Sequence, residues 1–427
     1  MKFSSQDFAP ELQQAIDACG YSDMTPIQQQ AIPTIRRGKD VLANAQTGTG
    51  KSAAFSLPIL QKLIDNPKSD SDNSKSPRTL ILTPTRELAE QLANTIKDYA
   101  QFLPFSVTSV YGGGKMSGQA AKLKAGTDIL IATPGRLLEH ISLCNVDLAK
   151  VEFVVLDEAD RMLDMGFITD VQKLLQHTSS SRQTLLFSAT ISHAVNGLAH
   201  KILKNHVVIS AAKQNITADT IEHVMYPVEE RRKVELFLEL FEQYNWFQVL
   251  VFTSTKEQAD RLLGALQQKR IEVAVCHGDI KQGARRRALA DFKSTKLQVL
   301  IATEVAARGI DIKGLDFVVN FNLPYLPEDY VHRIGRTGRA GKKGTAISLV
   351  SREEEHTVAK IEQLIGSKIQ RLTQDGFEVS NRNILIKNIQ AHSKVERSNK
   401  ATHTQIERAR RFKRGKLNSS VKSGNKS

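Results

Sequence analysis

The sequence predicts an α/β protein: two tandem parallel-sheet domains followed by a basic, mostly disordered C-terminal tail. Short apolar runs alternate with segments in which apolar residues recur at helical spacing, and this alternation is typical of a parallel sheet covered by helices on both faces. The alternation stops at a polar, irregular stretch at residues 211–219 and then restarts. A chain of 427 residues is long enough to bury more than one core.

The expected domain boundaries follow this change of pattern. We expect a first domain at residues 1–208, a linker at 209–220, a second domain at 221–380 and the tail at 381–427. The strands expected in the first domain are Val41–Ala43, Thr79–Thr83, Val107–Tyr111, Asp128–Ala132, Phe153–Leu156, Gln183–Phe187 and Val207–Ile209. Those expected in the second are Ile221–Val228, Val249–Thr253, Val273–Cys276, Val299–Ala302, Phe317–Asn320 and Ala346–Val350.

The distribution of charge along the chain indicates what kind of ligand the tail binds. The net charge is +14, and residues 381–427 hold 13 Lys and Arg against 2 Asp and Glu, which leaves residues 1–380 nearly neutral. A basic tail of this density favours a polyanion such as nucleic acid, although a merely solubilising tail is the alternative. Within the tail, Ile384–Ile389 is apolar enough for a short strand or helix.

Targeting and cysteine patterns point to the cytoplasm. No apolar run reaches membrane-spanning length, and the first residues lack a signal-peptide core, so we expect no membrane association. The three cysteines, Cys19, Cys144 and Cys276, are far apart and form no CxxC pair. They therefore suggest neither a disulfide framework nor a zinc site.

A glycine-rich loop between a short strand and a helix predicts a phosphate site. Backbone N–H groups of such a loop, together with the helix N-terminus, bind phosphate oxygens. Lys51 would reach the β- and γ-phosphates, and the Ser52 hydroxyl would bind magnesium. The loop consists of Ala45, Gln46, Thr47, Gly48, Thr49, Gly50, Lys51 and Ser52, with Ala45 where the general pattern has its first glycine.

Three carboxylates follow the apolar run Phe153–Leu156. Ligands of open α/β sheets bind at the carboxyl ends of the strands, although a solvated acidic turn, with a helix beginning near Arg161, is the alternative for this segment alone. Next to a phosphate loop, Asp157 would hold magnesium and Glu158 would orient and deprotonate water. The sequence therefore predicts a nucleoside-triphosphate hydrolase.

Other polar loops end the strands of the first half. Hydroxyls, glycines and single arginines along one rim suit a nucleic-acid backbone, although each loop alone also fits an ordinary helix cap or turn. These loops hold Pro84, Thr85, Arg86, Gly112, Gly113, Thr133, Pro134, Gly135, Arg136, Ser188, Ala189 and Thr190. Upstream of the phosphate loop, Tyr21 and Gln28 could stack on and hydrogen-bond an adenine, or serve as a core aromatic and a helix-surface amide.

The second half has no phosphate loop of its own but offers arginines between glycines at residues 332–341. An arginine supplied across an interface can stabilise a phosphoryl-transfer transition state, while a basic surface loop is the alternative. A nucleotide bound to the first half would then be shared with the second.

Taken together, these motifs resemble those of the DEAD-box ATP-dependent RNA helicases, most closely the bacterial RhlE-like branch, over roughly residues 3–365. The series runs in the family's order. Its members are Phe3 with Gly20–Gln28, Ala45–Ser52, Pro84–Ala89, Gly112–Gly113, Thr133–Arg136, Asp157–Asp160, Ser188–Thr190, Val251–Thr255, His277–Arg285, Ala302–Asp311 and His332–Gly341. The resemblance implies two RecA-like domains, ATP and Mg2+ as ligands, and a core that acts as a monomer on single-stranded RNA or short duplexes.

The resemblance also assigns roles to individual residues. Phe3, Tyr21 and Gln28 would recognise adenine, Asp311 the ribose, and Lys51, Ser52, Asp157 and Glu158 would act as described above. Arg336 and Arg339 would be arginine fingers, His332 would help to join the domains, and Ser188, Ala189 and Thr190 would couple nucleotide state to domain closure. Arg285, Thr303 and Arg308 would join the first-half loops in binding RNA.

Three positions depart from the commonest family pattern. Ser52 replaces a threonine, Met24 a proline and Glu304 an aspartate, and the last lengthens a side chain near the RNA-facing segment. Two other functions stay open: an ATP-controlled RNA clamp or annealing chaperone, and a DNA translocase. Ribosomal precursors and the RNA-decay machinery are candidate partners.

Overall fold

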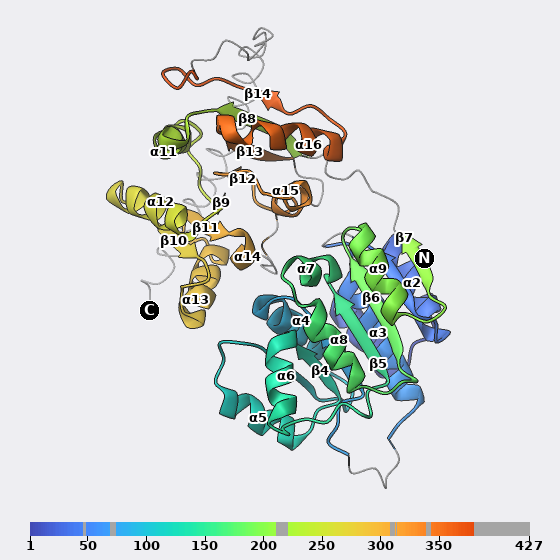
Figure 1. The fold of residues 1–427 in the computed structure, drawn as a ribbon. Coiled ribbons are helices and arrows are strands. Elements are labelled where there is room, and N and C mark those ends of the chain that lie inside the picture. The colour runs from blue at the N-terminus through green and yellow to red at the C-terminus, as the bar shows by residue number, and fades with distance from the viewer. Residues whose placement is uncertain are drawn as a thin grey trace, which may run out of the picture. The chain divides into compact units, whose positions relative to one another are not determined.

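The computed structural model describes residues 1–45, 48–68, 74–210, 221–307, 312, 314–338 and 343–379. Residues 1–378 form one compact unit, and its strands form two sheets of seven strands each, all paired in parallel (Figure 1). The predicted fold of two parallel-sheet domains is therefore confirmed. The expected element at Ile384–Ile389 lies outside the described residues.

The first sheet has the strand order β3-β4-β2-β5-β6-β1-β7. Its strands are β1 (Val41–Asn44), β2 (Thr79–Leu82), β3 (Val107–Val110), β4 (Ile129–Ala132), β5 (Phe153–Asp157), β6 (Gln183–Ser188) and β7 (Val207–Ser210). Its helices are η1 (Phe3–Ser5), α1 (Pro10–Ala18), α2 (Pro26–Arg36), α3 (Lys51–Asp65), α4 (Arg86–Tyr99), α5 (Met116–Ala125), α6 (Pro134–Ser142), α7 (Ala159–Asp164), α8 (Ile168–Gln176) and α9 (His193–Ile202).

Both faces of this sheet are buried, because successive residues of a strand point to opposite faces. Val155 packs into one apolar cluster with residues of α1 to α4, whereas its neighbours Val154 and Leu156 pack into a second cluster with residues of α6 to α9. The continuous apolar runs that predicted the strands have this physical cause.

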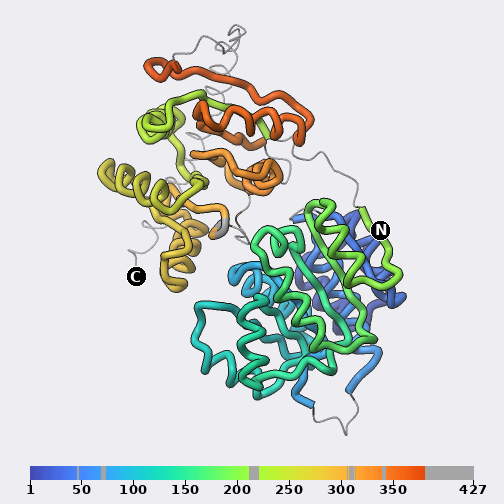
Figure 2. The backbone as a smooth tube through the Cα atoms, in the orientation of Figure 1, coloured from blue at the N-terminus to red at the C-terminus, as the bar shows by residue number. Residues whose placement is uncertain are grey.

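The second sheet has the order β10-β11-β9-β12-β13-β8-β14. Figure 2 shows the path of the backbone through this part of the chain as a tube. Its strands are β8 (Ile221–Pro227), β9 (Val249–Thr253), β10 (Val273–Cys276), β11 (Val299–Thr303), β12 (Phe317–Asn320), β13 (Gly344–Val350) and β14 (Gln370–Arg371). Its helices are η2 (Glu230–Arg232), α11 (Lys233–Gln243), α12 (Lys256–Gln268), α13 (Gln282–Lys293), α14 (Glu304–Ala307), α15 (Pro327–Ile334), η3 (Arg352–Glu354) and α16 (Glu355–Ile365).

The sequence placed the strands correctly, but some of their ends differ. The strand expected to start at Asp128 starts at Ile129, where the Asp128 carboxylate instead accepts hydrogen bonds from the Ser106 backbone and hydroxyl at 2.9 and 2.8 Å. The helix expected near Arg161 starts at Ala159. The two-residue strand β14 is too short to leave an apolar pattern. Among the described residues, no helix is long and apolar enough to cross a membrane.

Candidate nucleotide and nucleic-acid site

The carboxyl edge of the first sheet collects the predicted loops into two neighbouring groups. The phosphate loop, Asp157 and Ser188–Thr190 follow β1, β5 and β6, which are adjacent in the order β5-β6-β1. The loops beginning at Pro84, Gly112 and Thr133 follow β2, β3 and β4, which are adjacent in the order β3-β4-β2. One edge therefore carries a phosphate-type group beside a group of hydroxyls, glycines and arginines.

Lys51 begins helix α3 directly after the glycine-rich loop. Its preceding residue, Gly50, has a φ of 89°, a left-handed conformation that glycine adopts without strain. The Lys51 side chain is 6 % exposed, and its Nζ lies 3.7 Å from Asp157 Oδ1 without a hydrogen-bond partner in the described part of the chain. A buried ammonium group with unused donors at a helix N-terminus suits an anionic ligand.

Carboxylates outnumber cations around Lys51. Burial tends to lower the pKa of Lys51, but Asp157, Glu158 and Asp160 outweigh it and raise that pKa, so the side chain is charged. Burial raises the pKa of Asp157, while Lys51 opposes the rise. A cation beside Asp157 would relieve this excess of negative charge, and with the Ser52 hydroxyl nearby in sequence the donor set fits Mg2+, which takes oxygen ligands.

Gln28 joins the start of α2 to the phosphate loop. Its Oε1 accepts a hydrogen bond from Thr25 N at 2.8 Å, and its Nε2 donates one to the Gly50 carbonyl at 3.1 Å. A Cβ atom at Gly50 would lie 2.3 Å from Gln28 Nε2. Gln28 is 4 % exposed, so it is neither a helix-surface amide nor distant from the loop. A ligand contacted by Gln28 would therefore also influence the loop.

The aromatic residues upstream of the loop form a short stack. The Phe3 and Tyr21 rings are stacked with their centroids 5.9 Å apart, and the Tyr21 hydroxyl lies 3.1 Å from that of Tyr99. Tyr21 is 37 % exposed, whereas Phe3 is 1 % exposed. Tyr21 thus presents an exposed aromatic group on a buried support.

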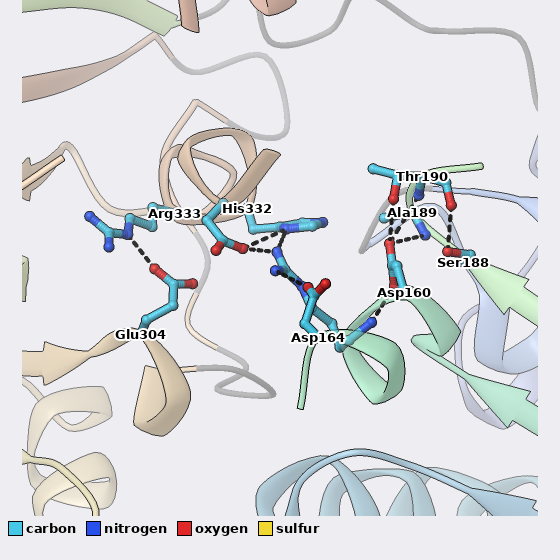
Figure 3. Close-up of polar contacts among 10 residues, drawn as sticks. Asp160, Asp164, Ser188, Ala189, Thr190, Glu304, His332 and Arg333 are labelled. Atoms are coloured by element: carbon cyan, nitrogen blue, oxygen red, sulfur yellow. Dashed lines mark hydrogen bonds and ion pairs between the residues drawn. The ribbon is translucent and has the colours of Figure 1, made fainter. Parts of the chain in front are cut away.

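Asp160 connects α7 to the segment after β6 (Figure 3). Its Oδ2 accepts hydrogen bonds from Ala189 N at 3.1 Å and from Thr190 N and Oγ1 at 3.0 Å each. The Ser188 hydroxyl donates to the Thr190 carbonyl at 2.7 Å, and the Ser188 carbonyl accepts from Ala45 N at 2.9 Å. The segment therefore contacts both the third carboxylate and the start of the phosphate loop.

The loops after β2, β3 and β4 are also joined to one another. Gly113 has a φ of 80°, and a Cβ atom there would lie 2.0 Å from a terminal nitrogen of Arg86. Arg136 donates to the Gly114 carbonyl at 3.0 Å. Thr85 caps α4 by accepting a hydrogen bond from Leu88 N at 3.3 Å, as in the ordinary helix-cap interpretation.

Sequence reasoning missed a buried network beneath these loops. His140 is fully buried, with Nε2 3.2 Å from Gln119 Oε1 and Nδ1 3.2 Å from Asn145 Nδ2. Gln119 also bonds both backbone groups of Tyr111, next to Gly112. Burial lowers the pKa of His140, and Arg136 lowers it further. A single histidine within a helical pattern gives no signal of this role.

The second domain contains fewer of the predicted site residues. Thr303 ends β11, His332 lies on α15, and Arg336 follows that helix and is 8 % exposed. Arg285 on α13 pairs with Glu87 of α4 at 2.7 Å, although the sequence assigned it to RNA. The remaining predicted residues lie outside the described part of the chain: Gln46, Thr47, Arg308, Asp311 and Arg339.

Arg161, one residue beyond the carboxylate motif, is a further contact that sequence reasoning missed. Its guanidinium group pairs with Asp329 and with Nδ1 of His332, both on α15 (Figure 3). Burial tends to lower the pKa of Arg161, but Asp329 outweighs it and raises that pKa. His332 thus contacts the segment that bears the carboxylates.

The first parallel sheet carries a phosphate loop and an acidic strand end, and a second sheet of the same kind follows it. This arrangement is that of a nucleotide-binding protein with tandem RecA-like domains. Residues 25–198 match the DEAD/DEAH box helicase family, and residues 232–341 match the helicase conserved C-terminal domain. The chain therefore belongs to the DEAD-box ATP-dependent RNA helicase family.

Individual relatives agree with this assignment. The chain is 42 % identical to the ATP-dependent RNA helicase RhlB of Pseudomonas aeruginosa, over 86 % of this chain and 94 % of that protein. It is 41 % identical to the DEAD-box ATP-dependent RNA helicase RhpA of Helicobacter pylori, over 82 % of this chain and 70 % of that protein. Its structure resembles S. cerevisiae Dbp5 bound to RNA and ADP BeF3, with a TM-score of 0.78, 31 % identity, and coverage of 88 % of this chain and 96 % of that chain.

Proposed function

We propose that this protein is an RNA-stimulated ATPase that uses closure of its two domains to unwind or remodel short RNA duplexes locally. The observation that carries the proposal is the buried Lys51 ammonium group beside Asp157, 3.7 Å from its carboxylate, at the N-terminus of α3. Its unused donors match the phosphates of a nucleotide. The relatives named above are RNA helicases, which favours RNA as the second ligand.

In this proposal the nucleotide is held mainly by the first domain. Lys51 and the loop backbone bind the β- and γ-phosphates, Tyr21 stacks on adenine, and Gln28 contacts the base edge. Glu158 orients the attacking water and takes its proton. Ser52 and Asp157 hold Mg2+, which offsets the negative charge of the phosphates.

The second domain completes the site. Arg336 and Arg339 stabilise the charge of the transition state, Asp311 binds the ribose, and His332 joins the domains through Arg161. Arginines acting in this way contribute roughly 10³–10⁵ in rate in phosphoryl-transfer enzymes. Hydrolysis without RNA is then slow, because the second domain completes the site only on closure.

RNA lies along the loops that follow β2, β3 and β4. Arg86, Thr133 and Arg136 contact its phosphates, and Thr303 and Arg308 do so from the second domain. Arg285 joins them while its carboxylate partner Glu87 orients it. Ser188 to Thr190 couple the nucleotide to closure, which the three hydrogen bonds to Asp160 Oδ2 support.

Steady-state ATP hydrolysis tests the proposal under three conditions: without nucleic acid, with RNA, and with DNA of the same sequence. We expect stimulation by RNA only. Equal stimulation by DNA would favour a DNA translocase, since 2′-hydroxyl contacts distinguish RNA from DNA. Arg336→Ala is expected to remove the stimulation, and full stimulation in that variant would contradict a site shared by the two domains.

The basic tail favours a second function, an ATP-controlled RNA clamp or annealing chaperone. Residues 381–427 carry most of the net charge of the chain, and polyanion binding by such a segment depends strongly on salt. Removal of residues 391–427 separates the two functions. In a helicase it weakens RNA binding with strand separation retained at high RNA concentration, whereas in a clamp it abolishes function while the ATPase rate stays the same.

We also propose the domain boundaries, the monomeric state, the cytoplasmic location, the family branch and the partners that the sequence predicts. The domains are residues 1–208 and 221–380, joined by a linker at 209–220, and the core acts as a monomer. The three cysteines are free, which suits a reducing cytoplasm. The motif series supports the RhlE-like branch, and relatives named RhlB, RhpA and CshA are among those that the chain matches. Ribosomal precursors or the RNA-decay machinery are the proposed partners.

A further inference from the structure

Arg333 lies between His332, which is predicted to help join the domains, and Arg336, a predicted arginine finger, and its own side chain is buried in the second domain. It is 2 % exposed, and its Nε donates to Glu304 Oε2 at 2.5 Å (Figure 3). One terminal nitrogen donates to Asn320 Oδ1 at 3.2 Å and to the Asn322 carbonyl at 2.7 Å.

These partners come from the carboxyl edge of the second sheet. Glu304 follows β11, Asn320 ends β12, and the guanidinium carbon lies 5.1 Å from the centroid of the Phe252 ring in β9. The strands β11, β9 and β12 are adjacent. A single side chain of α15 is therefore fixed to the ends of three neighbouring strands, and it is too enclosed to be a nucleotide or RNA ligand in this arrangement.

The pair also connects two segments with different expected ligands. Glu304 directly follows Thr303, which is proposed to contact RNA, whereas Arg333 lies one helical turn before Arg336, which is proposed to contact the nucleotide. A charge-assisted hydrogen bond to a buried arginine has a restricted geometry and is costly to break, because it would leave the arginine charge unpaired. A displacement of Thr303 would therefore be transmitted to α15 more effectively than through a solvated contact.

We propose that Glu304 and Arg333 form a positioning pair that transmits RNA binding at the Thr303 segment to the arginine-bearing turn after α15. This inference rests on the proposed function, because it concerns the coupling of RNA binding to ATP hydrolysis. Neither residue touches the reacting atoms. The pair sets the position of Arg336 when RNA is bound, and RNA-free hydrolysis does not depend on it.

The length of the Glu304 side chain is part of this arrangement. Its carboxylate meets Arg333 Nε at 2.5 Å, and an aspartate at the same backbone position would fall short by about one carbon–carbon bond, about 1.5 Å. The glutamate that departs from the family's usual aspartate is thus fitted to this Arg333 position. Glu304→Asp tests the distance, whereas Glu304→Gln tests the charge at nearly unchanged shape.

The test measures the ratio of kcat with saturating single-stranded RNA to kcat without RNA. For Glu304→Gln and Glu304→Asp we expect this ratio to fall about tenfold. The RNA-free kcat, the KM for ATP and the Kd for RNA should stay within about twofold of the unaltered protein. A change confined to the RNA-stimulated kcat is one that a merely structural ion pair would not produce.

A second partly buried glutamate in the same domain, Glu354 at the end of η3, provides the matched control. Glu354 has the same side-chain exposure as Glu304, 18 %, and pairs with the fully buried Lys233 at 2.6 Å. Glu354→Gln should lower the melting temperature about as much as Glu304→Gln does, while the RNA stimulation ratio stays within about twofold of the unaltered protein.

A double-mutant cycle tests whether Glu304 acts through Arg333. Arg333→Gln should also lower the stimulation ratio, and adding Glu304→Gln to it should lower the ratio no further. The interaction between the two sites would then be tenfold, which corresponds to about 1.4 kcal/mol. Multiplicative losses in the double variant would overturn the pairing.

Failure of the inference and failure of the proposed function give different results. If the unaltered protein shows no RNA stimulation, the proposed function is wrong and the inference falls with it. If the unaltered protein is stimulated and Glu304→Gln keeps the full ratio, only the inference is overturned. The same holds if Glu304→Gln and Glu354→Gln lower the ratio equally, since both would then act through stability.

Discussion

Replacing Asp160 by asparagine tests how strongly the carboxylate motif fixes the Ser188–Thr190 segment. The Asp160 carboxylate accepts four hydrogen bonds: one from Arg161 N at 3.0 Å through Oδ1 and three from Ala189 and Thr190 through Oδ2. Asparagine keeps the shape of the side chain, but one of its two oxygens becomes an N–H donor. In either orientation of the amide, at least one backbone N–H then faces another donor.

The magnitude follows from this arrangement. A buried donor left without an acceptor costs about 1–3 kcal/mol, and hydrogen bonds to a charged group are each worth about 1 kcal/mol more than neutral ones. Because Asp160 is only 7 % exposed and such costs are not additive, we expect the free energy of unfolding of the first domain to fall by about 3 kcal/mol.

Asp164 offers a matched substitution in the same helix. It pairs with Arg161 at 3.3 Å, but its side chain is 37 % exposed, so Asp164→Asn should cost less than about 1 kcal/mol. Urea unfolding followed by circular dichroism measures both variants. The chain has one tryptophan, Trp246 in the core of the second domain, whose fluorescence reports separately on that domain. Equal losses in the two variants would refute the reasoning.

The pH dependence provides a second readout for Asp160. Burial would raise the pKa of this carboxyl, but His332, Lys51, Arg161 and the Thr190 hydrogen bond outweigh it and lower the pKa. A carboxyl group with a lowered folded-state pKa contributes stability above its unfolded pKa of about 3.9, and this stability is lost as the pH falls through the folded value. Asp160→Asn should therefore reduce the loss of stability below about pH 4 relative to the unaltered protein.

Two further substitutions concern the loops proposed to bind RNA. Gly113→Ala should lower the free energy of unfolding by about 1–2 kcal/mol and weaken RNA binding, because a Cβ atom would displace Arg86 and the φ of 80° disfavours alanine. Thermal melting and RNA titration measure these two effects. The control is Gly118→Ala, in a helix with open space around it, which should be neutral or stabilising. Burial holds the pKa of His140 below its usual value, so the unfolded chain binds the proton first and the stability of the fold falls below about pH 6.5. His140→Gln should therefore lessen the fall in melting temperature between about pH 7 and 5.5. An unchanged fall would contradict a neutral, buried histidine.

The strands were predictable because a parallel strand buried on both faces leaves a continuous apolar run. Val154, Val155 and Leu156 are all fully buried, so their burial is visible in the sequence without knowledge of the partner strands. Strand order is different, because it depends on contacts between residues that are far apart in the chain. The sequence placed the polar loops at one rim, whereas their division into two neighbouring groups emerged only from the order β3-β4-β2-β5-β6-β1.

Each residue that sequence reasoning missed has at least one partner far away in the chain. Arg333 sits within the recognised arginine-rich segment, yet its partner Glu304 is 29 positions away. Gln119 and His140 are 21 positions apart on two different helices. Glutamine and histidine within amphipathic helices carry no pattern of their own, so the network could be found only once the helices were packed.

Glu158 carries information that its motif alone does not. It has a φ of 57° and a ψ of 52°, the left-handed region, which costs a residue with a side chain roughly 1–2 kcal/mol. Glycine would avoid this cost, so we expect the Glu158 carboxylate to serve the proposed hydrolysis rather than stability. We expect Glu158→Gly to be more stable than Glu158→Gln by about 1 kcal/mol in urea unfolding, with RNA-stimulated hydrolysis lost in both. If the glycine variant were less stable, the backbone conformation would not be strained; if it still hydrolysed ATP, the carboxylate would not be the base.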